Sequence, residues 1–211
     1  MNSCWPAAFV AGALAAAPGF AQTPPKADLS RAQSIVTQVC VACHGTDGNS
    51  AQPINPNLAG QHAEYTLKQL TNFKAQDGKP AARPSAVMAG IVANLSADDM
   101  RNLAAYFETQ KPKPRAARDP QLVKLGQAIY RGGVAVRGVA ACAACHGQDG
   151  AGVPAQFPRL AGQYAEYIGT QLKAFRAGER ANDSNRMMRA LAEKLTDREI
   201  AALAEYISGL R

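Results

Sequence analysis

The sequence predicts an all-α protein built from two similar helical units in tandem. Its 211 residues are 47% hydrophobic but only 6% aromatic, with frequent alanine-rich runs, and this composition favours helix over sheet. No alternation of apolar and polar residues is long enough for a half-buried strand. A segment of about 90 residues also occurs twice, which indicates a duplicated unit rather than a solenoid of short repeats.

Two sequence blocks carry the repeat. Cys40–Gly45 returns as Cys142–Gly147, 102 positions later, and Pro56–Gln61 returns as Pro158–Gln163 at the same offset. The alternating prolines between the units favour an extended, semi-rigid linker. The predicted boundaries are 1–21 for a signal peptide, 22–111 for an N-terminal domain, 112–118 for the linker and 119–211 for a C-terminal domain.

The first residues have the pattern of a secretory signal peptide. Met1–Ala21 contains no Lys, Arg, Asp or Glu, and Ala7–Ala17 is a run of small and apolar residues. We predict cleavage near Ala21 and export to the periplasm. The stretch is shorter than the roughly 20 apolar residues of a spanning helix, although a retained membrane anchor is the alternative. Cleavage removes Cys4 and leaves four cysteines.

Several helix starts can be placed from the sequence. Asp119 followed by Pro120 is a good N-cap with proline at the first helical position. Three pairs of residues have the spacing of capping boxes: Ser30 with Gln33, Ser96 with Asp99, and Thr196 with Glu199. The last two pairs predict helices over 97–109 and 197–209, where apolar residues at helical spacing, Met100 among them, are expected to face the core.

The motif Cys-x-x-Cys-His occurs in both units and is typical of c-type haem attachment. Two thiols three residues apart can form thioethers with the two vinyl groups of one porphyrin, which holds the adjacent histidine under the iron. The predicted thioether residues are Cys40, Cys43, Cys142 and Cys145, and the predicted proximal iron ligands are His44 and His146. The sequence therefore predicts two covalently bound haem c groups.

Other uses of these cysteines are weaker. A structural zinc site needs four ligands brought together, whereas the two pairs lie in separate units. A thioredoxin-like redox pair expects a βαβ setting, and two short disulfides would leave the paired histidines unexplained.

The sixth iron ligand separates electron carriers from enzymes, because an iron with His and Met ligands has no open position. Met88 and Met188 lie seven residues before Leu95 and Leu195, so the repeat selects them as iron ligands, with Met187 as the fallback.

Two further predictions concern the surroundings of the motif histidines. Pro56 and Pro158 each follow a motif histidine by 12 residues, and their carbonyls are expected to accept the imidazole N–H. His62 has Tyr164 at its matching position, and we expect it to lie on a helix surface rather than to bind metal.

The chain resembles the class I c-type cytochromes, and as a tandem pair it resembles the dihaem cytochrome c4 family. The resemblance rests on both Cys-x-x-Cys-His motifs, both Pro-x-Leu-Ala-Gly turns, Met88 and Met188. It implies two small helical cytochrome c domains, whose haems approach one another across a domain interface with their propionates near the contact. It also implies a soluble or membrane-associated periplasmic carrier that can deliver electrons to terminal oxidases. One departure is an insertion of eight residues between Ile129 and Cys142, which we expect to alter the exposure or partner contacts of the second haem.

The formal charge of +7 is uneven, with +1 up to Lys111 and +6 from Pro112 onward. One hypothesis is a basic face of Arg176, Arg180, Arg186 and Arg189 that docks on an acidic surface of a redox partner. The alternatives are an ordinary solvated surface or pairing of some arginines with haem propionates. Binding to nucleic acid is not expected of an exported haem protein.

Three functions compete at this stage. The first is a non-enzymatic carrier between respiratory-chain donors and a terminal oxidase or reductase, with peripheral membrane association allowed. The second is the cytochrome subunit of a flavocytochrome sulfide dehydrogenase. The third is a dihaem enzyme such as a peroxidase or thiosulfate dehydrogenase, which the candidate methionine in each unit disfavours.

Overall fold

The computed structural model describes residues 1, 26–76 and 78–211. Apart from Met1, the predicted signal peptide over 1–21 lies outside the described residues, as do Cys4 and the cleavage position at Ala21. In the described ranges, β structure is limited to three isolated bridges, and no helix there is long and apolar enough to cross a membrane.

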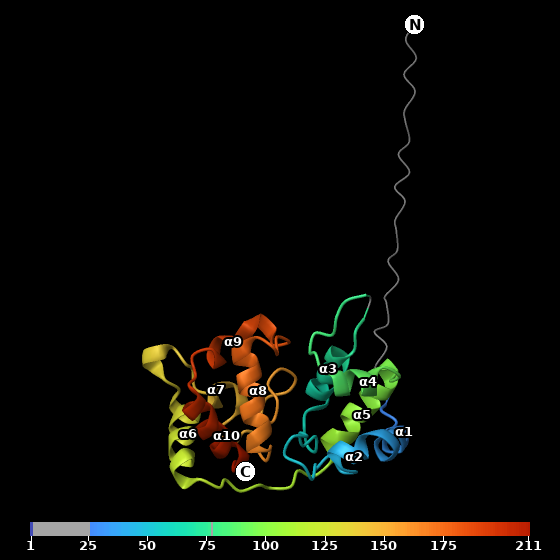
Figure 1. Cartoon of the computed structure of the whole chain (residues 1–211). Helices are drawn as coiled ribbons and strands as arrows, with labels where there is room; N and C mark the ends of the chain where they lie inside the picture. Colours follow the sequence, from blue (N-terminus) through green and yellow to red (C-terminus); the bar gives the residue numbers. More distant parts are fainter. Residues whose placement is uncertain (2–25, 77) are drawn as a thin grey trace.

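The helices form two groups that lie side by side (Figure 1). The first group comprises α1 (Leu29–Ile35), the π-helical turn η1 (Val36–Cys40), α2 (Val41–His44), α3 (Ala63–Phe73), α4 (Ala86–Val92) and α5 (Ala97–Thr109). The second comprises α6 (Pro120–Gly132), η2 (Ala135–Arg137), α7 (Ala143–His146), α8 (Ala165–Ala177), η3 (Ser184–Arg186), α9 (Met187–Ala192) and α10 (Asp197–Ser208). The protein is therefore all-α, as predicted.

Most predicted helix starts are present. Both reciprocal capping boxes form at the starts of α5 and α10, and the Asp119 carboxylate caps α6. The prediction for Ser30 and Gln33 is wrong, because α1 begins earlier. The Asp28 carboxylate accepts from the backbone N–H of Arg31 at 2.9 Å, and the Ser30 hydroxyl donates to the same carboxylate at 2.7 Å. A carboxylate upstream of the serine thus takes the capping role.

Each group has its own apolar core, in which the last helix packs on the first. In the first group, α5 packs on α1, and Met100 is only 4% exposed, as expected of a core residue. In the second group, α10 packs so closely on α6 that a methyl group at Gly126 would overlap the carbonyl oxygen of Ala202. Glycine permits this approach because it has no side chain.

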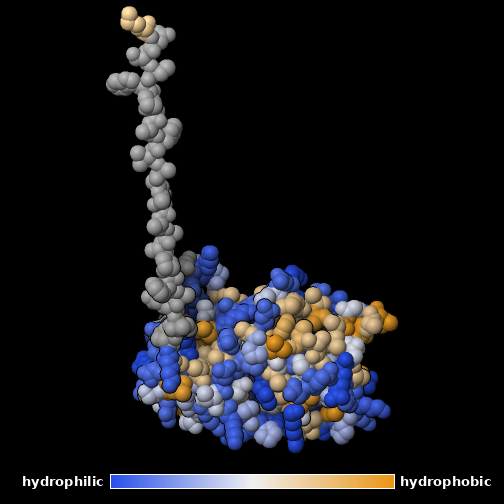
Figure 2. All heavy atoms as spheres, turned by 180° about the vertical axis from the view of Figure 1, so that it is seen from behind, coloured by the Kyte–Doolittle hydropathy of each residue, from blue (hydrophilic) through white to orange (hydrophobic). Residues whose placement is uncertain are grey.

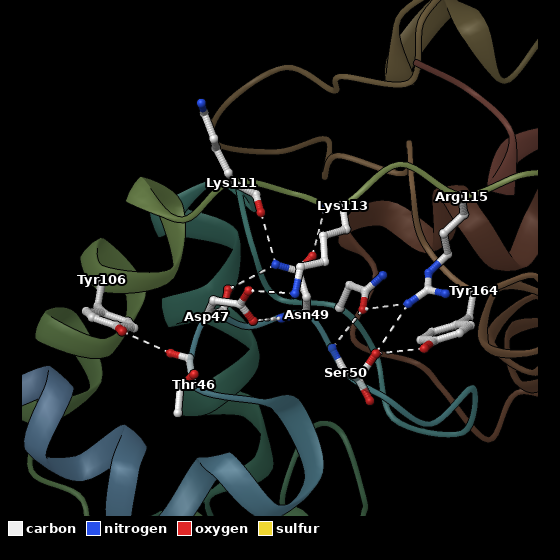
Figure 3. A network of polar contacts seen from close by, with 10 residues as sticks. Thr46, Asp47, Asn49, Ser50, Tyr106, Lys111, Lys113, Arg115 and Tyr164 are labelled. Atoms are coloured by element: carbon white, nitrogen blue, oxygen red, sulfur yellow. Dashed lines mark hydrogen bonds and ion pairs between the residues drawn. The ribbon is translucent and has the colours of Figure 1, made fainter.

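The segment between the groups is extended but tightly held (Figure 3). Its Lys113 backbone N–H donates to the Asn49 side chain at 2.8 Å, and the same side chain donates to the Lys111 carbonyl at 3.0 Å. The Lys113 ammonium lies 3.0 Å from the Asp47 carboxylate. The linker therefore runs along the loop that follows the first Cys-x-x-Cys-His motif.

Matching residues of the two units form reciprocal contacts across the interface. The Gln61 side chain donates to the Arg159 carbonyl and accepts from the Arg159 N–H, each at 2.9 Å. Gln163, at the matching position, forms the same pair with the backbone of Asn57, again at 2.9 Å. The duplicated units thus meet in a two-fold-like manner, as identical surface patches do in a symmetric dimer.

Candidate functional site

The first Cys-x-x-Cys-His motif lies where the N-terminal helix changes its winding. Cys40 closes the π-helical turn η1, and the short helix α2 carries the rest of the motif to His44. Cys40 is half-buried against the apolar core, Cys43 is exposed, and His44 is only 9% exposed. The turn thus directs one thiol and the imidazole inward and leaves the other thiol near solvent.

The second motif repeats this arrangement. Its residues begin just before α7, with Cys142 half-buried against the C-terminal core and His146 7% exposed. None of the four motif cysteines is joined in a disulfide. Burial raises the pKa of the Cys40 and Cys142 thiols, before they are attached to haem, to about 11.

Both motif histidines are oriented by a backbone carbonyl, as predicted. The Nδ1 atom of His44 lies 2.9 Å from the Pro56 carbonyl oxygen, and that of His146 lies 3.0 Å from the Pro158 carbonyl oxygen. Because a carbonyl only accepts, Nδ1 must donate, which leaves the lone pair of Nε2 free for a metal. Burial lowers the pKa of both imidazoles, and the hydrogen bond opposes this only in part. Both rings are therefore neutral at physiological pH, the form in which an imidazole can bind a metal.

The candidate methionines differ in exposure. Met88 lies in α4, is half-buried and packs against the same apolar cluster as Cys40. In α9, Met188 is half-buried whereas Met187 is 38% exposed. The helix follows two left-handed residues, Asn185 and Arg186, which reorient the chain just before the methionine pair. Of the two neighbours, Met188 is thus the one that lies closer to the protein interior.

This donor set fits a haem c and does not fit zinc. Each unit offers two spaced thiols, a neutral imidazole with a free nitrogen and a half-buried thioether. Cys40 and Met88 pack against the first apolar core, and Cys142 packs against the second. Across the described part of the chain, no group of three or more His, Cys, Asp or Glu side chains could hold a metal ion. A structural zinc site needs four such ligands, so that alternative has no support.

Comparison with known proteins identifies the family. The family model described as Cytochrome c matches residues 29–111 and 123–211. Cytochrome c4 of Azotobacter vinelandii is 49% identical over 178 residues, covering 82% of this chain and 84% of the relative. The crystal structure of reduced recombinant cytochrome c4 from Pseudomonas stutzeri matches with a TM-score of 0.82 and 41% identity, covering 88% of this chain and 100% of that one. The chain belongs to the cytochrome c4 family.

Membership of the cytochrome c4 family makes the chain a dihaem c-type electron carrier with two covalently bound haem c groups. A different kind of relative is named as the thiosulfate dehydrogenase electron acceptor of Stutzerimonas stutzeri. It is 36% identical over 209 residues, which cover 98% of this chain and 94% of the relative. The similarities thus include both cytochromes c4 and an acceptor for a sulfur-oxidising enzyme.

The expectation for His62 needs correction. His62 is half-buried at the start of α3, and its Nε2 atom lies 3.0 Å from the Ala151 carbonyl oxygen in the other group. Tyr164, at the matching repeat position, donates to the Ser50 carbonyl at 2.7 Å. His62 is therefore an interface residue rather than a surface one. The sequence offered one signal of this role, because the matching position in the other unit holds the aromatic residue Tyr164.

The hypothesis of a basic face of four arginines is also wrong as stated. Arg176 pairs with Asp197, Arg189 pairs with Asp183, and Arg180 is only 7% exposed at the domain interface. Arg186 remains exposed. Arg83, which has no distinguishing pattern in the sequence, is 9% exposed and donates across the same interface to the Tyr167 hydroxyl. Arg83 and Arg180 do not stand at matching positions of the repeat, so aligning the two units does not pair them.

The inserted segment before the second motif is folded back on its domain. A bridge between Val134 and Val139 closes the loop around η2, and Arg137 donates to the Lys194 carbonyl at 2.7 Å. Val136 at its tip is 94% exposed. Figure 2 shows an apolar tip that projects from the edge of the C-terminal group. The insertion thus places an apolar side chain in solvent beside the domain that carries the second motif.

Proposed function

We propose that this protein carries single electrons in the periplasm between respiratory-chain donors and a terminal oxidase or reductase. One observation supports this most strongly: each unit provides both an oriented imidazole and a half-buried methionine. An iron that is bound by both a histidine and a methionine side chain would have no open position, which suits electron transfer rather than substrate chemistry. The net charge of +7 favours a partner with an acidic docking surface.

The proposed roles follow from the chemistry of each side chain. Cys40, Cys43, Cys142 and Cys145 would form the thioethers that tether the haems. His44 and His146 would bind iron through Nε2, and Met88 and Met188 would bind it through sulfur. Haem c supplies the one-electron change between ferric and ferrous iron. The carbonyls of Pro56 and Pro158 hold the imidazole rings in place, which also increases their basicity as ligands.

Histidine substitution tests the methionine assignment. Met88→His and Met188→His should each selectively lower one of the two reduction potentials in a potentiometric titration, since a thioether ligand raises the potential of haem iron. Each variant should also lose part of the ferric absorption band that marks methionine ligation.

Met187→His is the matched control, because it changes the neighbouring residue on the same helix. It should leave both potentials unchanged. If Met187→His lowered a potential and Met188→His did not, Met187 would be the ligand. A high-spin haem in the unmodified protein would contradict the carrier proposal and favour an enzyme.

A second candidate donor is a thiosulfate-oxidising enzyme, supported by the similarity to named thiosulfate dehydrogenase electron acceptors. The test mixes ferric holoprotein with thiosulfate in the presence and absence of a thiosulfate dehydrogenase, and monitors haem reduction. Reduction only with the enzyme supports the acceptor role, whereas steady turnover with thiosulfate and an artificial acceptor alone would show catalysis by this chain.

Mass spectrometry of the periplasmic protein tests whether the signal peptide is cleaved near Ala21.

A further inference from the structure

The peptide group that orients each motif histidine also forms a hydrogen bond to the opposite domain. The Pro56 carbonyl oxygen, 2.9 Å from His44 Nδ1, belongs to the same peptide group as the Asn57 N–H. That N–H donates to Gln163 Oε1 of the C-terminal domain at 2.9 Å. A single peptide group therefore connects the imidazole of the first domain to a side chain of the second.

The second histidine has the same arrangement in the opposite direction. The Pro158 carbonyl oxygen, 3.0 Å from His146 Nδ1, shares its peptide group with the Arg159 N–H. That N–H donates to Gln61 Oε1 of the N-terminal domain at 2.9 Å. Gln61 and Gln163 occupy matching positions of the repeat. Each domain thus supplies the glutamine that bonds to the histidine-orienting peptide of the other domain.

The orientation of each glutamine amide is fixed by its other contacts. Nε2 donates to the carbonyl of the same opposite residue, Asn57 or Arg159, at 2.9 Å. The backbone N–H of the residue after each glutamine, His62 or Tyr164, donates to Oε1 at 3.0 Å. Because a carbonyl only accepts, Nε2 must face it, and Oε1 must face the two N–H groups. The acceptor end of each glutamine therefore meets the peptide that orients the histidine.

A peptide group transmits such a contact to the imidazole. Resonance couples its N–H to its carbonyl, so donation by the N–H increases the negative charge on the carbonyl oxygen. A more negative oxygen accepts more strongly from the imidazole N–H, which makes the ring a more basic ligand. A more basic ligand stabilises the more positive ferric iron and lowers its reduction potential. A glutamine of one domain can therefore act through the backbone on the iron of the other domain.

We propose that Gln61 and Gln163 are positioning residues, and that each lowers the reduction potential of the haem in the opposite domain. This inference rests on the proposed iron ligation by His44 and His146, but not on the identity of the redox partner. Contact between the domains is then part of what sets each potential. Separation of the domains would break both contacts and raise both potentials.

Potentiometric titration of the Gln163→Leu and Gln61→Leu holoproteins tests this inference, with Met88→His and Met188→His used to assign each potential to a domain. Gln163→Leu should raise only the potential of the N-terminal haem, and Gln61→Leu should raise only that of the C-terminal haem. The inference is overturned if neither potential changes, if both change together, or if only the haem of the substituted domain responds.

Gln163→Leu is the sharper of the two variants, because Asn57 has a second connection to the opposite domain. Its side chain donates to the Gly162 carbonyl at 2.8 Å in a buried contact, so the peptide should keep its place without Gln163. His62→Phe is the matched control. It removes an interdomain hydrogen bond to the Ala151 carbonyl that involves neither imidazole, and it should change neither potential.

Proton NMR of the ferrous holoproteins gives a readout that simple loosening of the interface would not reproduce. In Gln163→Leu the ring N–H signal of His44 should move to lower chemical shift, as its hydrogen bond weakens, while that of His146 stays in place. Gln61→Leu should show the reverse. Equal changes in both signals would indicate a loosened interface and contradict the proposal.

Two further observations cover the remaining outcomes. If a leucine variant does not assemble, Gln163→Asn and Gln61→Asn replace it, since the shorter amide withdraws its oxygen from the peptide and should act in the same direction. Ring N–H signals without a haem ring-current shift in the unmodified protein would show that the histidines do not bind iron. Ring-current-shifted signals that do not respond to the glutamine variants would overturn this inference alone.

Discussion

Two tyrosine hydroxyls hold the loop that follows the first Cys-x-x-Cys-His motif, and they differ in burial. Tyr164 donates to the Ser50 carbonyl at 2.7 Å in a buried contact that crosses the domain interface. Tyr106 donates to the Thr46 carbonyl at 2.9 Å in an exposed contact within the first domain (Figure 3). Ser50 also donates through its hydroxyl to the Cys43 carbonyl at 2.9 Å. Tyr164 therefore connects the C-terminal domain to the backbone of the first motif.

Replacement of each tyrosine by phenylalanine should show this difference. Tyr164→Phe should lower the free energy of unfolding by about 1 kcal/mol, because the buried Ser50 carbonyl loses the shorter of its two hydrogen bonds and keeps only the one from Arg115 at 3.3 Å. Tyr106→Phe is the matched control and should cost at most about 0.5 kcal/mol, since water can replace its hydroxyl. Denaturant unfolding of the holoproteins measures both values. Equal costs for the two variants would contradict the buried role of Tyr164.

At the scale of the helices, the two domains have different residues where the last helix crosses the first. In the second domain, α10 approaches α6 at Gly126, where the carbonyl of Ala202 occupies the place of a side chain. In the first domain, the position that corresponds to Gly126 is Ala32, which is completely buried in α1. The first crossing thus has room for a methyl group and the second does not.

Gly126→Ala should therefore destabilise the C-terminal domain by about 1–3 kcal/mol, as overpacked helix contacts do. Gly169→Ala provides the control, because a methyl group there would meet its nearest neighbour at 3.9 Å. That change should stabilise the protein by about 0.5–1 kcal/mol through helix propensity. Thermal unfolding of the two variants measures both effects. Stabilisation by Gly126→Ala would show that the crossing relaxes without cost.

At the scale of the whole molecule, duplication has produced an interface of matching residues. Gln61 and Gln163 each exchange two hydrogen bonds with the backbone of the opposite domain. The linker adds a second connection, because Arg115 lies over the Tyr164 ring with its guanidinium carbon 3.2 Å from the ring centre. The domains are thus held in one orientation by side chains and not by the linker alone.

The double variant Gln61→Ala/Gln163→Ala should loosen this orientation while each domain stays folded. We expect a larger radius of gyration in small-angle X-ray scattering, with an unchanged haem absorption spectrum. Gln121→Ala, at an exposed position in α6, should leave the scattering as it is. An unchanged radius in the double variant would mean that the linker and the contacts of Arg83 and Arg180 with the opposite domain are sufficient to hold the domains.

The sequence by itself determined the helical class, the duplication, the motif residues and the cap residues of α5, α6 and α10. These features depend on spacing along the chain, and a repeat doubles the evidence for each. The hydrogen bonds to the carbonyls of Pro56 and Pro158 were predictable for the same reason, because each proline follows its motif histidine by 12 residues.

Only the tertiary structure decided which charged and polar residues lie at the interface. His62 and Arg180 have the character of surface residues in the sequence, and Arg83 has no distinguishing pattern at all. Their burial arises when two domain surfaces meet, and that contact depends on residues more than 80 positions apart, such as Arg83 and Tyr167. Local periodicity reports which side of a helix faces its own core. It carries no information about a second domain that covers the opposite side.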